Sequence, residues 1–369
     1  MTTAADAGAV VRAPAWRADL AAALPGWIVA RVVVGVAWVI QLVDVRFRLD
    51  GEQPHHASLG LLAYDADVYR NIAEFGYEKI RFESLRFPPL LPVIGVNGTG
   101  IVIVANLCAL LAGAMVHRLA LDVTDDADLA RRAATLVALA PPAFTLVWGY
   151  SEGPFLLLAA AQLLALRRRR WVLAGGLGLL AALTRTSGVL LAVPAAVEAW
   201  LTLRERGVTV RSLAARALAV LGPIAGLVGY LVWVEVATGR GMAPVEIQSE
   251  LRDGTRFPPF RLIEALGEVA TDPLGDGLHA PFAFLMVFLV WVCWKRFPAS
   301  WTALAVVSAG TILAAGLLNS LERYAHGTVP ILVAGAAVSG GRWWRPVVAV
   351  SVVGMMGMTI LAWYGPFVP

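Results

Sequence analysis

Charged residues are scarce in this sequence. Asp, Glu, Lys and Arg make up 15% of the 369 residues, and 59% are hydrophobic. An ordinary soluble domain carries roughly 25% charged residues. The mean hydropathy is +0.71. These values exclude an ordinary soluble globular protein, and apolar runs of about 20 residues along the whole chain predict an all-α polytopic membrane protein.

Cysteine is scarce too. The chain has only two, Cys108 and Cys293, and both lie inside apolar runs. With no partner motif beside either cysteine, the sequence suggests neither a disulfide framework nor a zinc site. The doublet His55-His56 has no matching third ligand, so we expect it to be a solvated loop. The sequence predicts neither a metal nor a cofactor.

The apolar segments predict about eleven transmembrane helices in one domain that spans residues 1–369. The first begins near Leu24 and is longer than the apolar core of a signal peptide, so we expect it to remain as an anchor. The segments are 24–43, 91–117, 132–149, 153–166, 171–183, 187–202, 214–237, 280–294, 299–318, 328–340 and 346–363.

Arginine clusters between these segments predict the topology. Cytoplasmic loops of membrane proteins are enriched in Lys and Arg. One threading, with a cytoplasmic N-terminus, places every cluster in the cytoplasm. The clusters are Arg118, Arg131 and Arg132; Arg167 to Arg170; Arg204, Arg206, Arg211 and Arg216; Lys295 and Arg296; and Arg342 and Arg345.

The same threading leaves five segments on the extracytoplasmic face: 44–90, 150–153, 184–188, 238–279 and 319–327. A charge at membrane depth costs about 2.5–3.5 kcal/mol on insertion scales, so charged clusters at helix ends are usually paired or functional. Because several such ends share one face, we expect one shared cavity. The polar residues concerned are Asp65, Asp67, Arg70, Arg86, Tyr150, Ser151, Glu152, Thr184, Arg185, Thr186, Ser187, Asn319, Glu322, Arg323 and His326.

Two of these segments predict helices that lie along the membrane surface. In the first loop, 44–90, Val68, Ile72 and Phe75 form one apolar stripe, and Gly76 offers a stop. Asp65 or Asp67 can cap this helix, and Asp67 can pair with Arg70. The Pro-rich stretch at 86–92 is expected to turn the chain into the next span.

In the second long loop, 238–279, a stripe of Phe260, Ile263, Leu266 and Val269 predicts an amphipathic surface helix. Arg261, Glu264 and Glu268 lie on its opposite side. Such a helix either covers an entry groove for lipid or braces the surface without touching substrate.

Several motifs carry a family resemblance. They are YDADVYRNIAEFGY at 64–77, RFPPLLPVIG at 86–95, Asn106, the stretch from LAPPAFTLVWGYSEG to LTRTSG at 139–188, and LERYAHGTVP at 321–330. In this order they resemble the PIG-V family of glycosylphosphatidylinositol mannosyltransferases and its actinobacterial relatives. The resemblance covers roughly residues 60–195 and returns near 320–330. It implies a GT-C glycosyltransferase fold.

The resemblance also implies a function. The chain would be an inverting mannosyltransferase that takes mannose from polyprenyl-phosphate mannose on the extracytoplasmic face of the cell membrane. The acceptor would be a glycolipid such as a phosphatidylinositol mannoside or a lipoglycan. Membrane lipids are therefore the expected partners, and nucleic acid is not. Nucleotide sugars are not expected outside the cytoplasm, which agrees with a lipid-linked donor.

The resemblance places the general base at Asp65, and Asp67 is the second acidic candidate. The leaving phosphate needs cations and hydrogen-bond donors. Arg323, His326 and Arg185 are the candidates, with Arg86 as a fourth, and Arg323 is favoured because a guanidinium grips phosphate bidentately. Substrate contacts are predicted for Tyr64, Tyr150 and Glu152. Local alternatives remain, since Glu152 can cap the helix that follows it and Glu322 can pair with Arg323.

Two other classes of function stay open. A lipid or solute transporter also carries intramembrane charges, although the sequence shows no internal repeat. An intramembrane serine hydrolase would use Ser151, in GYSEG, with His326. That motif needs a preceding strand, whereas an apolar helix is expected here.

Overall fold

The computed structural model describes residues 15–49, 51–203 and 209–365, and in this part of the chain the regular secondary structure is helical apart from one isolated bridge between Thr255 and Ala315. Within it, six helical stretches are long and apolar enough to cross a membrane. The prediction of an all-α polytopic membrane protein is confirmed. The six stretches are α1 (Ala15–Arg48), α5 (Gly98–Thr124), η5 with α9 (Thr186–Leu203), α10 (Val210–Thr238), α13 (Asp276–Arg296) and η6 with α17 (Gly341–Tyr364).

The remaining helices are shorter. Apolar helices of 10–17 residues are α8 (Trp171–Ala182), α14 (Ala299–Leu313) and α16 (Val329–Val338). They pack among the long ones together with α6 (Ala127–Leu139) and α7 (Glu152–Arg167). Short helical pieces connect them: α2 (His55–Ser58), η1 (Gly60–Leu62), α3 (Asp65–Phe75), η2 (Tyr77–Lys79), η3 (Phe82–Arg86), α4 (Leu90–Gly95), η4 (Pro141–Leu146), α11 (Ala243–Glu250), α12 (Pro258–Thr271) and α15 (Leu321–His326).

Two of the predicted transmembrane segments are not continuous helices, and each is interrupted by a local feature of its backbone. The segment 91–117 is interrupted at Val96, which has a φ of 66°, and restarts as α5 after Asn97. The Asn97 side chain accepts a hydrogen bond of 2.9 Å from the Gly100 amide and so caps α5. The segment 132–149 loses its α-helix at Leu139, because Pro141 and Pro142 cannot continue the hydrogen-bond ladder.

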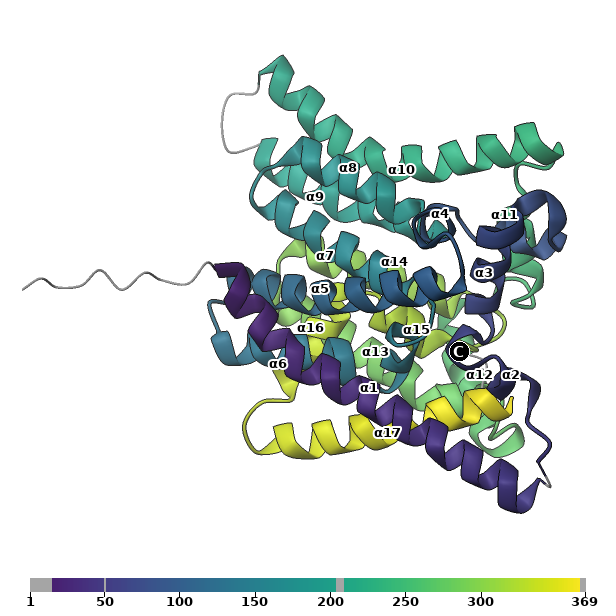
Figure 1. Cartoon of the computed structure of the whole chain (residues 1–369). Coiled ribbons are helices and arrows are strands. Elements are labelled where there is room, and N and C mark those ends of the chain that lie inside the picture. Colours follow the sequence, from purple (N-terminus) through teal and green to yellow (C-terminus); the bar gives the residue numbers. More distant parts are fainter. Residues whose placement is uncertain (1–14, 50, 204–208, 366–369) are drawn as a thin grey trace, which may run out of the picture.

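The ends of the bundle differ in what they carry. In Figure 1, α1 begins at the same end as the turns between α5 and α6, α7 and α8, and α16 and α17, where the arginine clusters lie. The pieces α2, α3, α11 and α12 lie at the opposite end. This separation agrees with the predicted threading, while the cytoplasmic and extracytoplasmic assignment stays a prediction. Arg204 and Arg206 lie outside the described residues.

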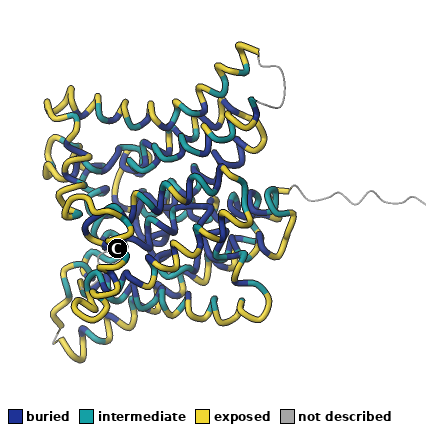
Figure 2. Tube along the Cα trace, turned by 180° about the vertical axis from the view of Figure 1, so that it is seen from behind, coloured by how far each residue is buried: buried dark blue, intermediate teal, exposed yellow. Residues whose placement is uncertain are grey.

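The outer helices present apolar side chains on their surfaces. Figure 2 shows buried residues along the central helices and exposed residues on the outer faces. On α1, Val32 and Val39 are 58% and 57% exposed, and on α10 Val232 is 56% exposed. Apolar surface of this kind is expected where helices meet lipid.

Both segments predicted as surface helices form helices, α3 and α12, while their position along the membrane surface stays a prediction. α3 ends at Gly76, whose φ of 74° suits glycine, and it buries Ile72 while Phe75 stays exposed. In α12 the apolar stripe faces outward, and Phe260 and Ile263 are exposed. Arg261 is buried on the inner side and forms ion pairs with Glu268 and Asp276. α12 therefore packs through Arg261 and the fully buried Ala265 and presents the apolar stripe away from the protein.

Candidate active site

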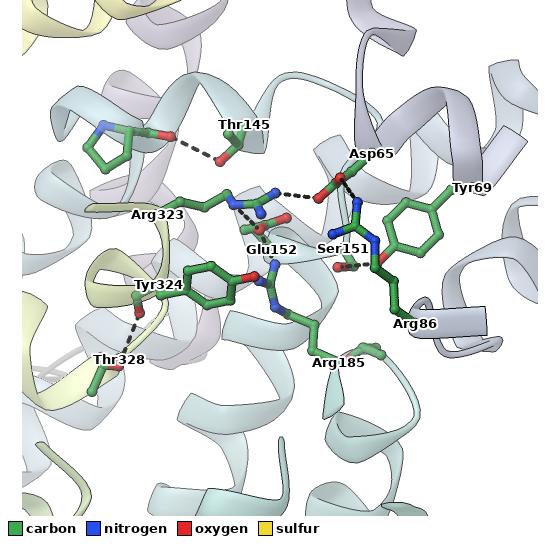
Figure 3. Close-up of polar contacts among 12 residues, drawn as sticks. Asp65, Tyr69, Arg86, Thr145, Ser151, Glu152, Arg185, Arg323, Tyr324 and Thr328 are labelled. Carbon is green, nitrogen blue, oxygen red and sulfur yellow. Dashed lines mark hydrogen bonds and ion pairs between the residues drawn. The ribbon is translucent and has the colours of Figure 1, made fainter. Parts of the chain in front are cut away.

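Five charged side chains from separate elements meet in one cavity of about 520 Å³. Asp65 and Glu152 are the first residues of α3 and α7, where the free amides of a helix start favour a carboxylate. Arg86 ends η3, Arg185 directly precedes η5, and Arg323 belongs to α15. Figure 3 shows these side chains pointing toward one another.

The five groups form a row of alternating charges. An Arg323 Nη1 group donates a hydrogen bond of 2.6 Å to Asp65 Oδ2, and Arg86 Nη2 lies 3.7 Å from Asp65 Oδ1. Arg323 Nε is also 3.4 Å from Glu152 Oε1, which accepts a hydrogen bond from Arg185. Asp65 and Glu152 are thus each flanked by two arginines, and Arg323 is shared between them.

The arginines control the protonation of Asp65. Burial by itself raises the pKa of this carboxyl, but Arg323, Arg86 and Arg185 together outweigh burial and hold the pKa below its usual value. The Asp65 side chain is 20% exposed, so it remains reachable from the cavity. Asp65 is therefore an ionised carboxylate at neutral pH.

The charge of the cavity lining is positive. Four arginines line it, Arg86, Arg185, Arg252 and Arg323, against two carboxylates, Asp65 and Glu152, so the lining carries two more positive than negative charges. Guanidinium groups in excess over carboxylates favour an anionic ligand such as phosphate.

Apolar side chains form another part of the same cavity. They come from η5, α10, α11 and α14, and include Leu190, Leu191, Leu227, Val245, Leu304 and Ile312. A cavity with a cationic part and an apolar part suits an amphipathic ligand that carries an anionic head.

Tyr64 and Tyr150 lie next to members of the charged row, Tyr64 beside Asp65 and Tyr150 beside Arg323. Tyr64 has a φ of 54°, uncommon for a residue other than glycine, directly before Asp65. Its hydroxyl donates to the Ala362 carbonyl over 2.9 Å and its ring stacks on His56. Tyr150 is fully buried, and the Arg323 guanidinium lies 5.3 Å from its ring centre. Neither tyrosine is among the residues that line the cavity, and the substrate contacts predicted for them stay predictions.

Asp67 points elsewhere. Its carboxylate accepts hydrogen bonds from Arg70 and from the Asn71 side chain on the same helix, the latter over 3.2 Å. Asp67 does not line the cavity. The helix-local pairing expected as an alternative for Asp67 is the arrangement seen.

His326 also lies away from the cavity. Its Nε2 lies 3.1 Å from the Val137 carbonyl oxygen, and burial lowers the pKa of the ring to about 4 despite backbone hydrogen bonds that raise it. His326 is not among the residues that line the cavity, and its predicted role in binding phosphate stays a prediction. The local pair expected between Glu322 and Arg323 is not formed, because His279 Nδ1 lies 2.8 Å from Glu322 Oε1.

Sequence reasoning missed two residues of the cavity. Arg252, between α11 and α12, and Tyr324, beside Arg323, both line it. The position of Tyr324 inside LERYAHG was a usable signal. Arg252 belongs to no motif, and its place depends on how its segment folds.

The pair needed for a serine hydrolase is not formed. Ser151 Oγ accepts a hydrogen bond of 2.8 Å from the Tyr69 hydroxyl. The described hydrogen bonds contain none between Ser151 and His326, which bonds to Val137 instead. Among the described residues, no group of three His, Cys, Asp or Glu is placed to hold a metal, and the predicted absence of a metal stays a prediction.

Comparison with known proteins gives structural matches only. No protein-family model and no curated protein sequence matches the chain. It is similar to ArnT from Cupriavidus metallidurans bound to undecaprenyl phosphate, with 18% identity, a TM-score of 0.49, and coverage of 90% of this chain and 64% of ArnT. It is also similar to the archaeal oligosaccharyltransferase AglB from Archaeoglobus fulgidus in complex with an inhibitory peptide and a dolichol-phosphate. That match has 12% identity and a TM-score of 0.44, and covers 92% of this chain and 56% of AglB.

The chain spans less than two thirds of the length of ArnT and of AglB. Both TM-scores are below 0.5, so nothing about the activity of this chain follows from these two similarities. The resemblance to the PIG-V family stays a prediction.

Proposed function

We propose that the chain is a glycosyltransferase with a GT-C fold, related to the PIG-V family, that transfers a sugar from a polyprenyl-phosphate carrier to a lipid-linked acceptor. The observation that carries this proposal is the cavity itself. It joins one reachable carboxylate, Asp65, to an excess of arginines and to apolar walls. The sugar is proposed to be mannose and the acceptor a phosphatidylinositol mannoside or a related lipoglycan, reached from the extracytoplasmic face.

The proposed reaction inverts the anomeric carbon. An acceptor hydroxyl attacks this carbon while Asp65 takes the hydroxyl proton as general base. The bond between the anomeric carbon and the phosphate oxygen breaks, and its electron pair stays on the phosphate. The products are the glycosylated acceptor, protonated Asp65 and polyprenyl phosphate.

The arginines take the charge that develops on the leaving phosphate. A phosphodiester carries one negative charge and the released monoester approaches two, so cations fixed beside it stabilise the transition state more than the donor. Arg323, Arg185 and Arg86 are the proposed ligands, and Arg252 adds a fourth positive charge to the lining. A bound phosphate competes with Asp65 for Arg323, which frees a carboxylate oxygen for the acceptor hydroxyl.

The test is sugar transfer by the purified chain in proteoliposomes. Labelled polyprenyl-phosphate mannose and polyprenyl-phosphate glucose are offered separately with a glycolipid extract, and label in the acceptor lipids is measured. We expect transfer from the mannose donor by the wild type and by Arg70→Gln, because Arg70 pairs with Asp67 outside the cavity lining. Arg185→Gln, which removes a cavity cation, is expected to lose most of the transfer.

The opposing outcomes are distinct. Transfer from the glucose donor alone would replace mannose but keep the reaction. No transfer from either donor, with labelled lipid or solute moving across the bilayer, would contradict the proposal and favour a transporter.

A further inference from the structure

Tyr324 is the centre of a cluster of three arginines. Its ring centre lies 4.6 Å from the guanidinium of Arg252, 4.8 Å from that of Arg185 and 5.2 Å from that of Arg323. Each contact is within cation–π range. In Figure 3 the Tyr324 side chain points toward Arg185 and Glu152, at one end of the charged row. No motif or charge pattern of the sequence assigned a role to this tyrosine.

Three separate parts of the chain bring these arginines to the ring. Arg185 precedes η5 and Arg323 adjoins Tyr324 in α15. Arg252 arrives on the segment that follows α11. This segment is tied to the chain before α15, since the Leu317 amide donates to the Arg252 carbonyl over 3.1 Å and the Arg256 amide donates to the Ala314 carbonyl over 2.8 Å. The backbone therefore fixes Arg252 and α15 relative to each other.

The surrounding charges alter the acidity of the phenol. Burial alone raises the pKa of Tyr324, but Arg252, Arg323 and Arg185 outweigh burial and lower the pKa to about 8, with Asp65 opposing them. Glu152, beside Arg185, is the other carboxylate of the cavity lining. The Tyr324 hydroxyl is thus a stronger hydrogen-bond donor than that of an ordinary tyrosine. It carries its proton below a pH of about 8.

We propose that the Tyr324 hydroxyl donates a hydrogen bond to the phosphate of the polyprenyl-phosphate sugar and stabilises that phosphate as it leaves. This inference rests on the proposed function and adds a group to its catalytic site. The hydroxyl keeps its proton throughout: the acceptor proton goes to Asp65, and the electron pair of the broken bond stays on the phosphate. The arginines supply positive charge to the phosphate, and the neutral Tyr324 hydroxyl adds a directed hydrogen bond.

The test compares Tyr324→Phe with Tyr364→Phe. Each variant loses one hydroxyl, but Tyr364 lies at the end of α17, where it donates to Asp44 and does not line the cavity. We expect Tyr324→Phe to lower kcat/KM for the sugar donor about 10- to 100-fold, the range for one hydrogen bond to a charged group. Tyr364→Phe should match the wild type.

The pH profile gives a readout that a merely structural role would not move. In the wild type, kcat/KM for the donor should fall above pH of about 8, as Tyr324 loses its proton. Tyr324→Phe should lack this decline. Binding of polyprenyl phosphate, measured by fluorescence titration without turnover, should weaken in Tyr324→Phe and show the same loss of pH dependence.

The failures of the two proposals are distinguishable. If the wild type transfers sugar and Tyr324→Phe keeps the wild-type kcat/KM and its alkaline decline, the role of Tyr324 is refuted and the proposed function stands. If the wild type transfers no sugar, the proposed function fails and the inference fails with it.

Discussion

The carboxylate of Asp65 and the guanidinium of Arg323 are joined by a hydrogen bond of 2.6 Å across 258 positions of the chain. The pair links α3, within the first long loop, to α15, near the C-terminal helices. Arg323 is buried and reaches Glu152 as well. The proposed base and a proposed phosphate ligand therefore depend on each other in both position and charge.

Removing Arg323 should destabilise the protein. Arg323→Gln removes the cation that Asp65 and Glu152 share, and loss of one partner of a buried ion pair costs about 3–5 kcal/mol. The expected result is a lower free energy of unfolding, measured by chemical denaturation in detergent. In Asp65→Asn/Arg323→Gln the effects should not add, with a coupling of about 0.5–3 kcal/mol. Additive effects would show that the two residues do not interact.

Removing Arg86 should move the acid side of the pH profile. Arg86 is one of the cations that hold the pKa of Asp65 below its usual value, against burial. Arg86→Gln therefore raises this pKa, and the acidic loss of kcat should begin at a higher pH than in the wild type. An unchanged acid limb would mean that Asp65 is not the group that titrates.

The lowered pKa of Asp65 also predicts how the free energy of unfolding depends on pH. Because the folded-state pKa of Asp65 is below its unfolded value, its ionisation stabilises the fold above the unfolded pKa, and this contribution is lost as the pH falls through the folded pKa. Arg86→Gln should shrink the contribution, so variant and wild type should differ less in free energy of unfolding at acidic pH than at neutral pH. Equal differences at both pH values would contradict this account.

The contact between His279 and Glu322 should hold α15 in place. Both residues are buried, at 3% exposure each. His279→Ala leaves the Glu322 carboxylate without this partner and should lower the free energy of unfolding by about 1–3 kcal/mol, as expected for an unsatisfied buried group. The matched change Arg70→Ala breaks a partly exposed pair within one helix and should cost less than about 1 kcal/mol. Equal losses in the two variants would contradict the structural role of His279.

The sequence predicted most of the helices and the end of the bundle that carries the site. Apolar runs are local signals, and arginine clusters such as Arg167 to Arg170 separate one end from the other. The breaks at Asn97 and Pro141 were readable in principle, since a helix cap and a proline act locally. Asp65, Glu152, Arg185 and Arg323 came from motifs and do meet in one cavity, although their roles remain proposals.

Contacts that depend on packing were not predictable. Arg252 reaches the cavity because the segment 252–256 pairs with 314–317, and no short stretch of sequence encodes that pairing. Glu322 bonds to His279, which lies 43 positions away, rather than to its neighbour Arg323. His326 turns toward Val137 for the same kind of reason. In each case the preferred partner is set by which helices lie side by side.

The most direct test of the central claim is sugar transfer by Asp65→Asn and Asp67→Asn at matched protein levels. Both variants replace a carboxylate by an amide of the same shape on the first turn of α3. Asp65→Asn should lower kcat about 10²- to 10⁴-fold, the range for loss of a general base, while Asp67→Asn should stay close to the wild type. Wild-type transfer by Asp65→Asn, or loss in Asp67→Asn alone, would contradict the assignment of Asp65 as the base.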